Sequence, residues 1–227
     1  MSDMSKMLSQ VRVQEMSQSE LNDLKRNGEG NAWPWYLQCA GSIMAHNYYV
    51  HHLISNHVRS IPNLTKIVEL GTGYGTMTIP LALNAISYGG LPHKKDENGI
   101  DTIMLMKDVP VVTFDIKDIR EPQIKKVHDR LNVRFIELDL FQNVEIITHQ
   151  HIPDGPIYLL CDNGNKKKEF EIFVPKLAKG SLISVHDYMQ EFFDVDAQEL
   201  IDRGVVEEVE KEEWMKYDCQ FATYRRI

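Results

Sequence analysis

The sequence has few cysteines and no long apolar run. Its three cysteines, Cys39, Cys161 and Cys219, are scattered and odd in number, which favours a reducing compartment over a disulfide framework. No stretch offers about 18 uninterrupted apolar residues, and the first residues lack the apolar run of a signal peptide. We therefore expect a cytoplasmic protein without membrane partners.

Positive charge is also scarce, because 25 Lys and Arg stand against 33 Asp and Glu, a formal net charge of −8. An acidic chain is repelled by phosphate backbones, so this balance argues against nucleic acid as a partner. Apolar residues make up 43% of the 227 residues, which is typical of a globular protein and not of a disordered one. The length suits one elaborated domain with a small cap, and composition says nothing of the oligomeric state.

The pattern of the chain changes near residue 63. Before it, residues 17–20 have the spacing of a helix capping box, and the apolar residues over 34–59 follow a mostly helical period. We therefore expect a helical N-terminal cap over residues 1–62 and a second domain over residues 63–227.

In the second domain, short β-rich runs alternate with helix-like segments, which indicates parallel βαβ units. These runs cover residues 66–70, 111–116, 133–138, 157–161 and 182–185. Two later runs, 205–209 and 220–226, have no room for a crossover helix between them and should pair antiparallel. The sequence thus predicts a Rossmann-like, doubly wound α/β fold, with a mostly parallel seven-stranded sheet and a C-terminal antiparallel hairpin.

The strongest motif is a glycine loop between a strand and a helix. It reads Glu69-Leu70-Gly71-Thr72-Gly73-Tyr74-Gly75, and a helix is expected over 77–87. Glycines let the backbone turn tightly and approach a ligand closely. The spacing is G-x-G-x-G, which differs from the G-x-G-x-x-G of dinucleotide binders.

An acid follows each of the next two strands: Asp115, which precedes Ile116, and Asp139, which precedes Leu140. Ligands of open α/β sheets lie across the carboxyl ends of the strands, so these acids and the glycine loop should converge on one crevice. There Asp115 is placed to accept hydrogen bonds from ribose hydroxyls, and Asp139 to accept one from an adenine amino group. Each acid alone fits a helix N-cap about as well.

With these motifs, residues 66–227 resemble class I S-adenosylmethionine-dependent methyltransferases. The resemblance implies that the glycine loop borders the methionine portion of the cofactor, that Asp115 holds the ribose, and that Asp139 with Leu140 holds the adenine. The implied cofactor contacts are Glu69, Gly71, Thr72, Gly73, Tyr74, Gly75, Asp115, Ile116, Asp139 and Leu140. A loop-like insertion over 88–101 accounts for the gap of roughly 40 residues between Gly75 and Asp115.

Asp162 follows the fourth strand, and His186 and Asp187 follow the fifth. These strand ends resemble the branch of cephalosporin hydroxylase-like and macrocin-type O-methyltransferases, in which carboxylates at both positions bind a divalent cation. The resemblance implies Asp162 and Asp187 as metal ligands, for example of Mg²⁺, and we take these two acids together with His186 as the candidate catalytic group.

The chain departs from that branch at His186 and Gly164, where further acids are common. Three interpretations stay open: fewer carboxylates hold the metal, a borderline metal is used, or no metal binds and His186 is the general base. A buried or capping role for His186 is a fourth.

The sequence therefore predicts O-methylation of a small-molecule hydroxyl. Methylation of nucleic acid or protein is an alternative, but residues 162–165 lack the prolines of the Asp/Asn-Pro-Pro-aromatic motif used on adenine. A non-catalytic binding protein with a cofactor fold is another, and the intact glycine loop argues against it. Lys166, Lys167 and Lys168 open the next helix; we interpret them as a solvated face, with attraction of an anionic substrate as the other interpretation.

Overall fold

A seven-stranded sheet forms the centre of the molecule, with the strand order β11-β12-β10-β9-β4-β7-β8. The computed structural model describes residues 12–15, 35–39, 42–88, 93–95, 101–103, 109–212 and 220–227. The strands of this sheet are β4 Lys66–Leu70, β7 Val111–Asp115, β8 Val133–Glu137, β9 Ile157–Cys161, β10 Leu182–His186, β11 Val206–Glu208 and β12 Phe221–Arg226.

The sheet is mostly parallel, as the sequence predicts. Strands β8, β7, β4, β9 and β10 pair parallel in that order, while β12 pairs antiparallel with both β10 and β11. The five parallel strands end at one carboxyl edge, and in β9 every residue is buried. Continuous burial of this kind requires helices on both faces, and it fits the mostly apolar sequences of the central strands, which lack strict alternation.

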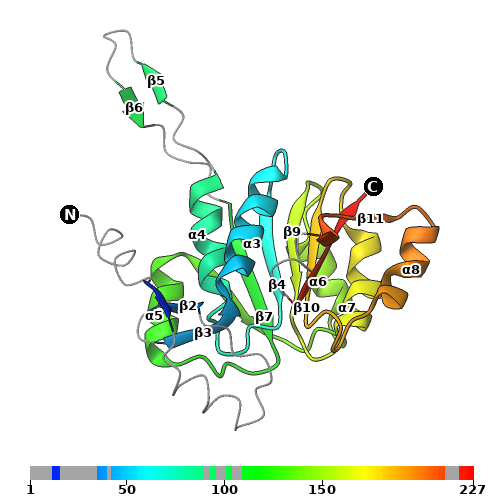
Figure 1. The fold of residues 1–227 in the computed structure, drawn as a ribbon, viewed down its shortest axis with the longest axis horizontal. Coiled ribbons are helices and arrows are strands. Elements are labelled where there is room, and N and C mark those ends of the chain that lie inside the picture. The colour runs from blue at the N-terminus through cyan, green and yellow to red at the C-terminus, as the bar shows by residue number, and fades with distance from the viewer. Residues whose placement is uncertain are drawn as a thin grey trace.

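Helices cover both faces of the sheet (Figure 1). One layer holds α3 Tyr48–Ser60, α4 Thr78–Tyr88 and α5 Pro122–Arg130, and the other holds α6 Val144–His151, α7 Lys166–Phe173 and α8 Asp194–Asp202. Helix α7 ends in a 3₁₀ turn, η1 Val174–Lys176, because Pro175 cannot continue an α-helix. Gly204 follows α8 with φ +62°, so a glycine stops this helix as the sequence predicts.

The N-terminal part corrects the prediction of a helix over 34–59. Strands β1 Arg12–Glu15, β2 Trp35–Cys39 and β3 Ser42–Asn47 form a separate antiparallel sheet, and the helix begins only at Tyr48. Short apolar runs satisfy strand and helix periods alike, and the aromatic residues that open β2 favour a strand. The helix expected near 17–20 lies outside the described residues, and the division into domains at residue 62 stays a prediction.

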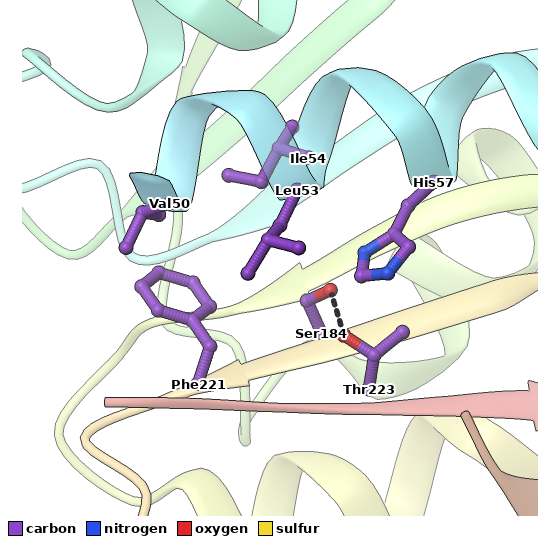
Figure 2. A pocket seen from close by; sticks show the side chains of 7 residues that line it. All are labelled: Val50, Leu53, Ile54, His57, Ser184, Phe221 and Thr223. Carbon is purple, nitrogen blue, oxygen red and sulfur yellow. Dashed lines mark hydrogen bonds between the residues drawn. The ribbon is translucent and has the colours of Figure 1, made fainter. Parts of the chain in front are cut away.

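Helix α3 packs on the sheet through one face. Val50, Leu53, Ile54 and His57 recur at the spacing of a helix face, and Figure 2 shows them pointing toward β10 and β12. Between these elements remains a cavity of ≈ 10 Å³, room for about one water molecule. It is a packing space and not a ligand site.

The insertion after α4 also differs from the expected loop. It contains two short antiparallel strands, β5 His93–Lys95 and β6 Asp101–Ile103, which lie away from the main sheet in Figure 1. Backbone hydrogen bonds across a hairpin need no apolar pattern, so the polar composition of 88–101 gave no sign of them. None of the helices in the described ranges has both the length and the apolar character that crossing a membrane requires.

Candidate active site

The glycine loop connects β4 to α4 at the carboxyl edge of the sheet. Gly71, Gly73 and Gly75 have φ of +94°, +51° and +80°, a region that side chains with a Cβ rarely adopt. A Cβ on Gly71 would lie 2.4 Å from the carbonyl oxygen of Asp162, and one on Gly75 would lie 2.8 Å from the ring of His128. Among the described residues, a Cβ on Gly73 would meet nothing within 4 Å. Protein therefore surrounds the outer two glycines, whereas Gly73 faces open space.

Hydrogen bonds tie this loop to the end of the neighbouring strand β7. The backbone N–H of Gly73 donates to Oδ2 of Asp115 at 2.8 Å, and the N–H groups of Gly71 and Thr72 donate to the carbonyl of Phe114 at 2.9 and 3.0 Å. The structure thus brings the glycine loop together with Asp115, the first predicted acid, although Gly73 and Asp115 are 42 positions apart in the sequence.

Two large apolar side chains are exposed in the same segments. Tyr74 in the glycine loop is 68% exposed, and Ile116, the residue after Asp115, is 69% exposed. Exposed apolar side chains are common singly, but here they flank a backbone that is open to a ligand. They could cover an apolar or aromatic group bound beside Gly73.

Asp139 lies at the end of β8, where its carboxylate holds a turn. Oδ1 accepts from the N–H groups of Phe141 and Gln142 at 2.9 and 3.1 Å, and Oδ2 accepts from Nε2 of Gln142 at 2.8 Å. The next residue, Leu140, is buried. Asp139 therefore has a capping role, and its contact with adenine stays a prediction.

Glu69 is buried beneath the loop rather than exposed in a crevice. Its Oε2 accepts from the hydroxyls of Thr78 and Thr113, each at 2.5 Å, and its Oε1 has no hydrogen-bond partner in the described part of the chain. Burial raises the pKa of Glu69 to about 8, although the two hydroxyls act in the opposite direction. Glu69 therefore links β4, α4 and β7 as a mostly neutral acid at pH 7.

His128 on α5 supports the loop from the other side, and no motif in the sequence indicates this role. Its Nε2 lies 2.8 Å from the carbonyl oxygen of Gly75, and its Nδ1 lies 2.9 Å from Nη1 of Arg120. Since Arg120 can only donate, Nδ1 accepts and Nε2–H donates to Gly75. Burial lowers the pKa of His128 to about 4, which keeps the ring neutral. Asp118 in turn holds Arg120, at 2.9 Å from its Nε.

Across β4 from Asp115, the ends of β9 and β10 bring three predicted residues together. His186 Nδ1 lies 2.6 Å from Oδ1 of Asp162, and its Nε2 lies 3.5 Å from Oδ1 of Asp187. Potential metal ligands are His, Cys, Asp and Glu side chains. In the part of the chain that the structure describes, only this group brings three of them together with ligand atoms within 4.8 Å of one another. Burial lowers the pKa of His186, but both carboxylates raise it, and the net pKa lies above the usual value.

Lys166, the first residue of α7, belongs to the same cluster. Its Nζ donates to Oδ2 of Asp187 at 2.8 Å and to Oε2 of Glu191 at 2.7 Å, and lies 4.0 Å from Oδ1 of Asp162. The interpretation of a solvated face is therefore wrong for Lys166, which is buried, although Lys167 and Lys168 are exposed.

The tertiary structure causes the burial of Lys166. Helix α7 starts four residues after Asp162, so its first turn faces the acids that β10 and the following loop present. The role of Glu191 was missed for the same reason. Burial alone lowers the pKa of Lys166, but its hydrogen bonds to Asp187 and Glu191 raise it above the usual value.

Comparison with known proteins gives likenesses in structure only. No protein-family model matches the chain, and no curated protein matches it in sequence. Solved structures do match its fold. A structure of cmcI with Mg and SAM superposes with a TM-score of 0.56 at 14% identity, covering 90% of this chain and 84% of that one.

Two further structures match with similar scores. The O-methyltransferase TomG from Streptomyces achromogenes, in complex with SAM, has a TM-score of 0.52 at 12% identity, over 100% of this chain and 99% of that one. CalS11, a TDP-rhamnose 3'-O-methyltransferase of calicheamicin biosynthesis, has a TM-score of 0.53 at 15% identity, over 78% and 77%. With the strand order, these likenesses confirm the predicted fold: the chain adopts the Rossmann-like fold of S-adenosylmethionine-dependent O-methyltransferases.

Proposed function

We propose that this protein transfers the methyl group of S-adenosylmethionine to a hydroxyl of a small molecule. One observation carries the proposal: a single edge of the sheet presents a ligand-accessible glycine loop and a cluster of proton-accepting side chains on opposite sides of β4. The loop meets Asp115 on the β7 side, and Asp162, His186 and Asp187 gather on the β9 side. Ligands of such sheets bind where the strand order reverses, which here is between β4 and β9.

The residues present fit the cofactor. Gly73 has open space where a Cβ would stand, so a ligand can approach its backbone closely. Asp115 is positioned to hold the ribose hydroxyls, and the exposed side chains of Tyr74 and Ile116 supply apolar cover for the adenine. Gly71, Gly75 and Glu69 would shape the loop, and Asp139 with Leu140 would border the adenine.

The cofactor supplies an activated methyl group, so the protein must align the two reactants and accept a proton. His186 suits the second task. Its Nδ1–H donates to Asp162, which leaves Nε2 to accept the proton of the hydroxyl. The imidazolium formed in this way lies between Asp162 and Asp187, whose charges stabilise it. Base catalysis of this kind contributes about 10²- to 10⁴-fold in rate.

A divalent cation would be held by Asp162, His186 and Asp187, whose donor atoms are close enough to share one ion. A bound cation lowers the pKa of a coordinated hydroxyl and fixes its orientation. Carboxylate oxygens suit Mg²⁺, whereas the histidine nitrogen favours a borderline ion. Lys166, which already donates to Asp187, stands beside this donor set.

Calorimetry on dialysed protein tests the cofactor. We expect S-adenosylmethionine and S-adenosylhomocysteine to bind with one site per chain. Absence of heat at high micromolar cofactor would refute the proposal.

The acceptor site is tested by replacing Asp187 with Ala. We expect this variant to lose methyl transfer, measured as S-adenosylhomocysteine released across a panel of hydroxyl-bearing small molecules, while its cofactor affinity stays unchanged. Turnover that survives the substitution would show that the acceptor site lies elsewhere. Cofactor binding without turnover of any acceptor would favour a non-catalytic role.

A further inference from the structure

The proposed acceptor site contains a cation of its own. The side chain of Lys166 is 5% exposed, and its ammonium lies between Asp187 and Glu191, with Asp162 at 4.0 Å. We propose that the ammonium of Lys166 occupies the cation position of this site and competes with divalent metal ions for it. The inference rests on the proposed function only in taking Asp162, His186 and Asp187 as the acceptor site.

The carboxylates that a metal would use already have nitrogen atoms of this chain close to them. Oδ2 of Asp187 accepts from Lys166 at 2.8 Å, and its Oδ1 lies 3.5 Å from Nε2 of His186. Oδ1 of Asp162 lies 2.6 Å from Nδ1 of His186. A divalent ion binds carboxylate oxygen at roughly 2.0–2.6 Å, so an ion on Oδ2 of Asp187 would stand directly against the ammonium. The metal-free arrangement is therefore complete, with Lys166 as its positive charge.

Lys166 is fixed in this position by the elements on both sides of it. The side chain of Asn165 caps α7 by accepting from the N–H of Lys168 at 3.1 Å, and Phe170 of the same helix is fully buried in the core. On the other side, Glu191 is held by its N–H, which donates to the carbonyl of Asp187 at 2.9 Å. The ammonium of Lys166 is thus held between the first turn of α7 and the short loop that follows β10.

The neighbouring lysine provides a matched comparison. Lys167 carries the same charge one residue later, but its side chain is 54% exposed and pairs with Asp196 at 3.2 Å and Glu171 at 3.9 Å. Replacement of Lys167 therefore changes the net charge equally without opening the site. Replacement of Lys166 removes the ammonium that faces Asp162, Asp187 and Glu191, and a divalent ion can then take its place.

Manganese binding to the full chain tests this inference without knowledge of the acceptor. The signal of free Mn²⁺ in electron paramagnetic resonance gives the Kd for wild type, Lys166→Met, Lys166→Gln and Lys167→Met. We expect both Lys166 variants to bind one Mn²⁺ at least about tenfold more tightly than wild type, because an adjacent positive charge is removed. The Kd of Lys167→Met for Mn²⁺ should equal that of wild type. Gln keeps a hydrogen-bond donor near Asp187, so it guards against misfolding of the Met variant.

Two further measurements locate the ion. In the Lys166→Gln background, Asp187→Asn should remove the gained Mn²⁺ affinity. Mn²⁺ should also raise the Tm of Lys166→Gln more than that of wild type, since a ligand stabilises the state that binds it.

The inference is overturned if wild type binds Mn²⁺ as tightly as the Lys166 variants, or if neither wild type nor these variants bind Mn²⁺. An equal gain of Mn²⁺ affinity in Lys167→Met would also overturn it. Calorimetry with S-adenosylmethionine on the same samples separates this result from the proposed function. A variant that binds cofactor but gains no Mn²⁺ affinity refutes the role of Lys166 alone. Absence of cofactor binding in wild type refutes the proposed function.

Discussion

The two sides of β4 at the carboxyl edge of the sheet are built by different physical means. On the β7 side, the glycine loop is held by backbone N–H groups, the two hydroxyls on Glu69 and the neutral ring of His128. On the β9 side, two acids, a lysine and a histidine face one another within hydrogen-bond or ion-pair distance. The first side is mostly neutral and closely packed, whereas the second is a balance of charges.

This difference teaches which substitutions each side tolerates. A closely packed loop is sensitive to added atoms and to loss of single hydrogen bonds, because neighbouring backbone cannot move away. A cluster of buried charged side chains is sensitive to any change in its net charge, because a buried charge without a partner destabilises the fold. Single substitutions on each side of β4 distinguish the two kinds of sensitivity.

The glycine loop should show the largest effect. In Gly71→Ala, the Cβ would lie 2.4 Å from the carbonyl oxygen of Asp162 at φ +94°, so both overlap and backbone strain oppose folding. We expect a loss of about 3 kcal/mol or more in the free energy of unfolding, measured by urea denaturation, and no cofactor binding.

Gly73→Ala is the control for this effect, because its Cβ would meet no atom of the described residues within 4 Å. We expect a loss of only about 1–2 kcal/mol from its positive φ, together with a cofactor affinity lowered by about tenfold or more. Equal losses of stability in the two variants would contradict the contrast between packed and open glycines.

Glu69 should make stability depend on pH near neutrality. Its pKa is raised to about 8 in the folded state from an ordinary value of 4.5, so its contribution is fully present below pH 4.5 and is lost as pH rises through about 8. We expect Glu69→Gln to remove a slope of about 1.4 kcal/mol per pH unit within that window. Urea denaturation at pH 5, 6, 7 and 8 measures it. Parallel curves for variant and wild type would show that Glu69 ionises normally.

His128 should matter through its hydrogen bond to Gly75. We expect His128→Ala to lower stability by about 2 kcal/mol and to weaken cofactor binding several-fold, because the loop loses this anchor. His149→Ala, at an exposed position on α6, should change neither.

The pH dependence of the same variant gives a second readout. The pKa of His128 is lowered to about 4, so its contribution is present above pH 6.5 and is lost as pH falls toward 4. The variant should lose less stability than wild type between pH 6.5 and 4. An acid transition as steep as that of wild type would argue that other groups cause it.

The smallest effect is expected at the surface of the charge cluster. Lys167→Met replaces a side chain that is 54% exposed, and we expect no measurable change in the free energy of unfolding or in cofactor affinity. A loss as large as that of His128→Ala would mean that surface charge, and not the buried cluster, dominates this side of β4.

Much of the fold could be predicted because the central strands are buried on both faces. Their mostly apolar runs, the glycine loop and the lack of room for a helix before β12 predicted the strands, the crossovers and the terminal antiparallel pair. The prediction failed over 35–47, where strands β2 and β3 replace the expected helix. In such short apolar runs both periods fit, and only pairing partners decide.

The candidate site could be predicted only where a residue directly follows a strand. Asp115, Asp162, His186 and Asp187 were found in this way, and the structure places each at the expected strand end. His128 and Glu191 could not be found, because a helix face and a loop bring them to the site. Lys166 was misread for the same reason, since its sequence neighbours are exposed and its acidic partners are distant in the chain.

The sequence by itself determined the sheet, the glycine loop and the edge at which the strand-end acids gather, because these depend on local patterns and on the direction of the strands. Only the tertiary structure decided that Glu69 is enclosed, that Asp139 caps a turn and that Lys166 neutralises the acids at the end of β10. The physical reason is that burial and charge pairing are set by neighbours in space. The residue type shows that a side chain can carry a charge, but its neighbours in the folded protein determine the role of that charge.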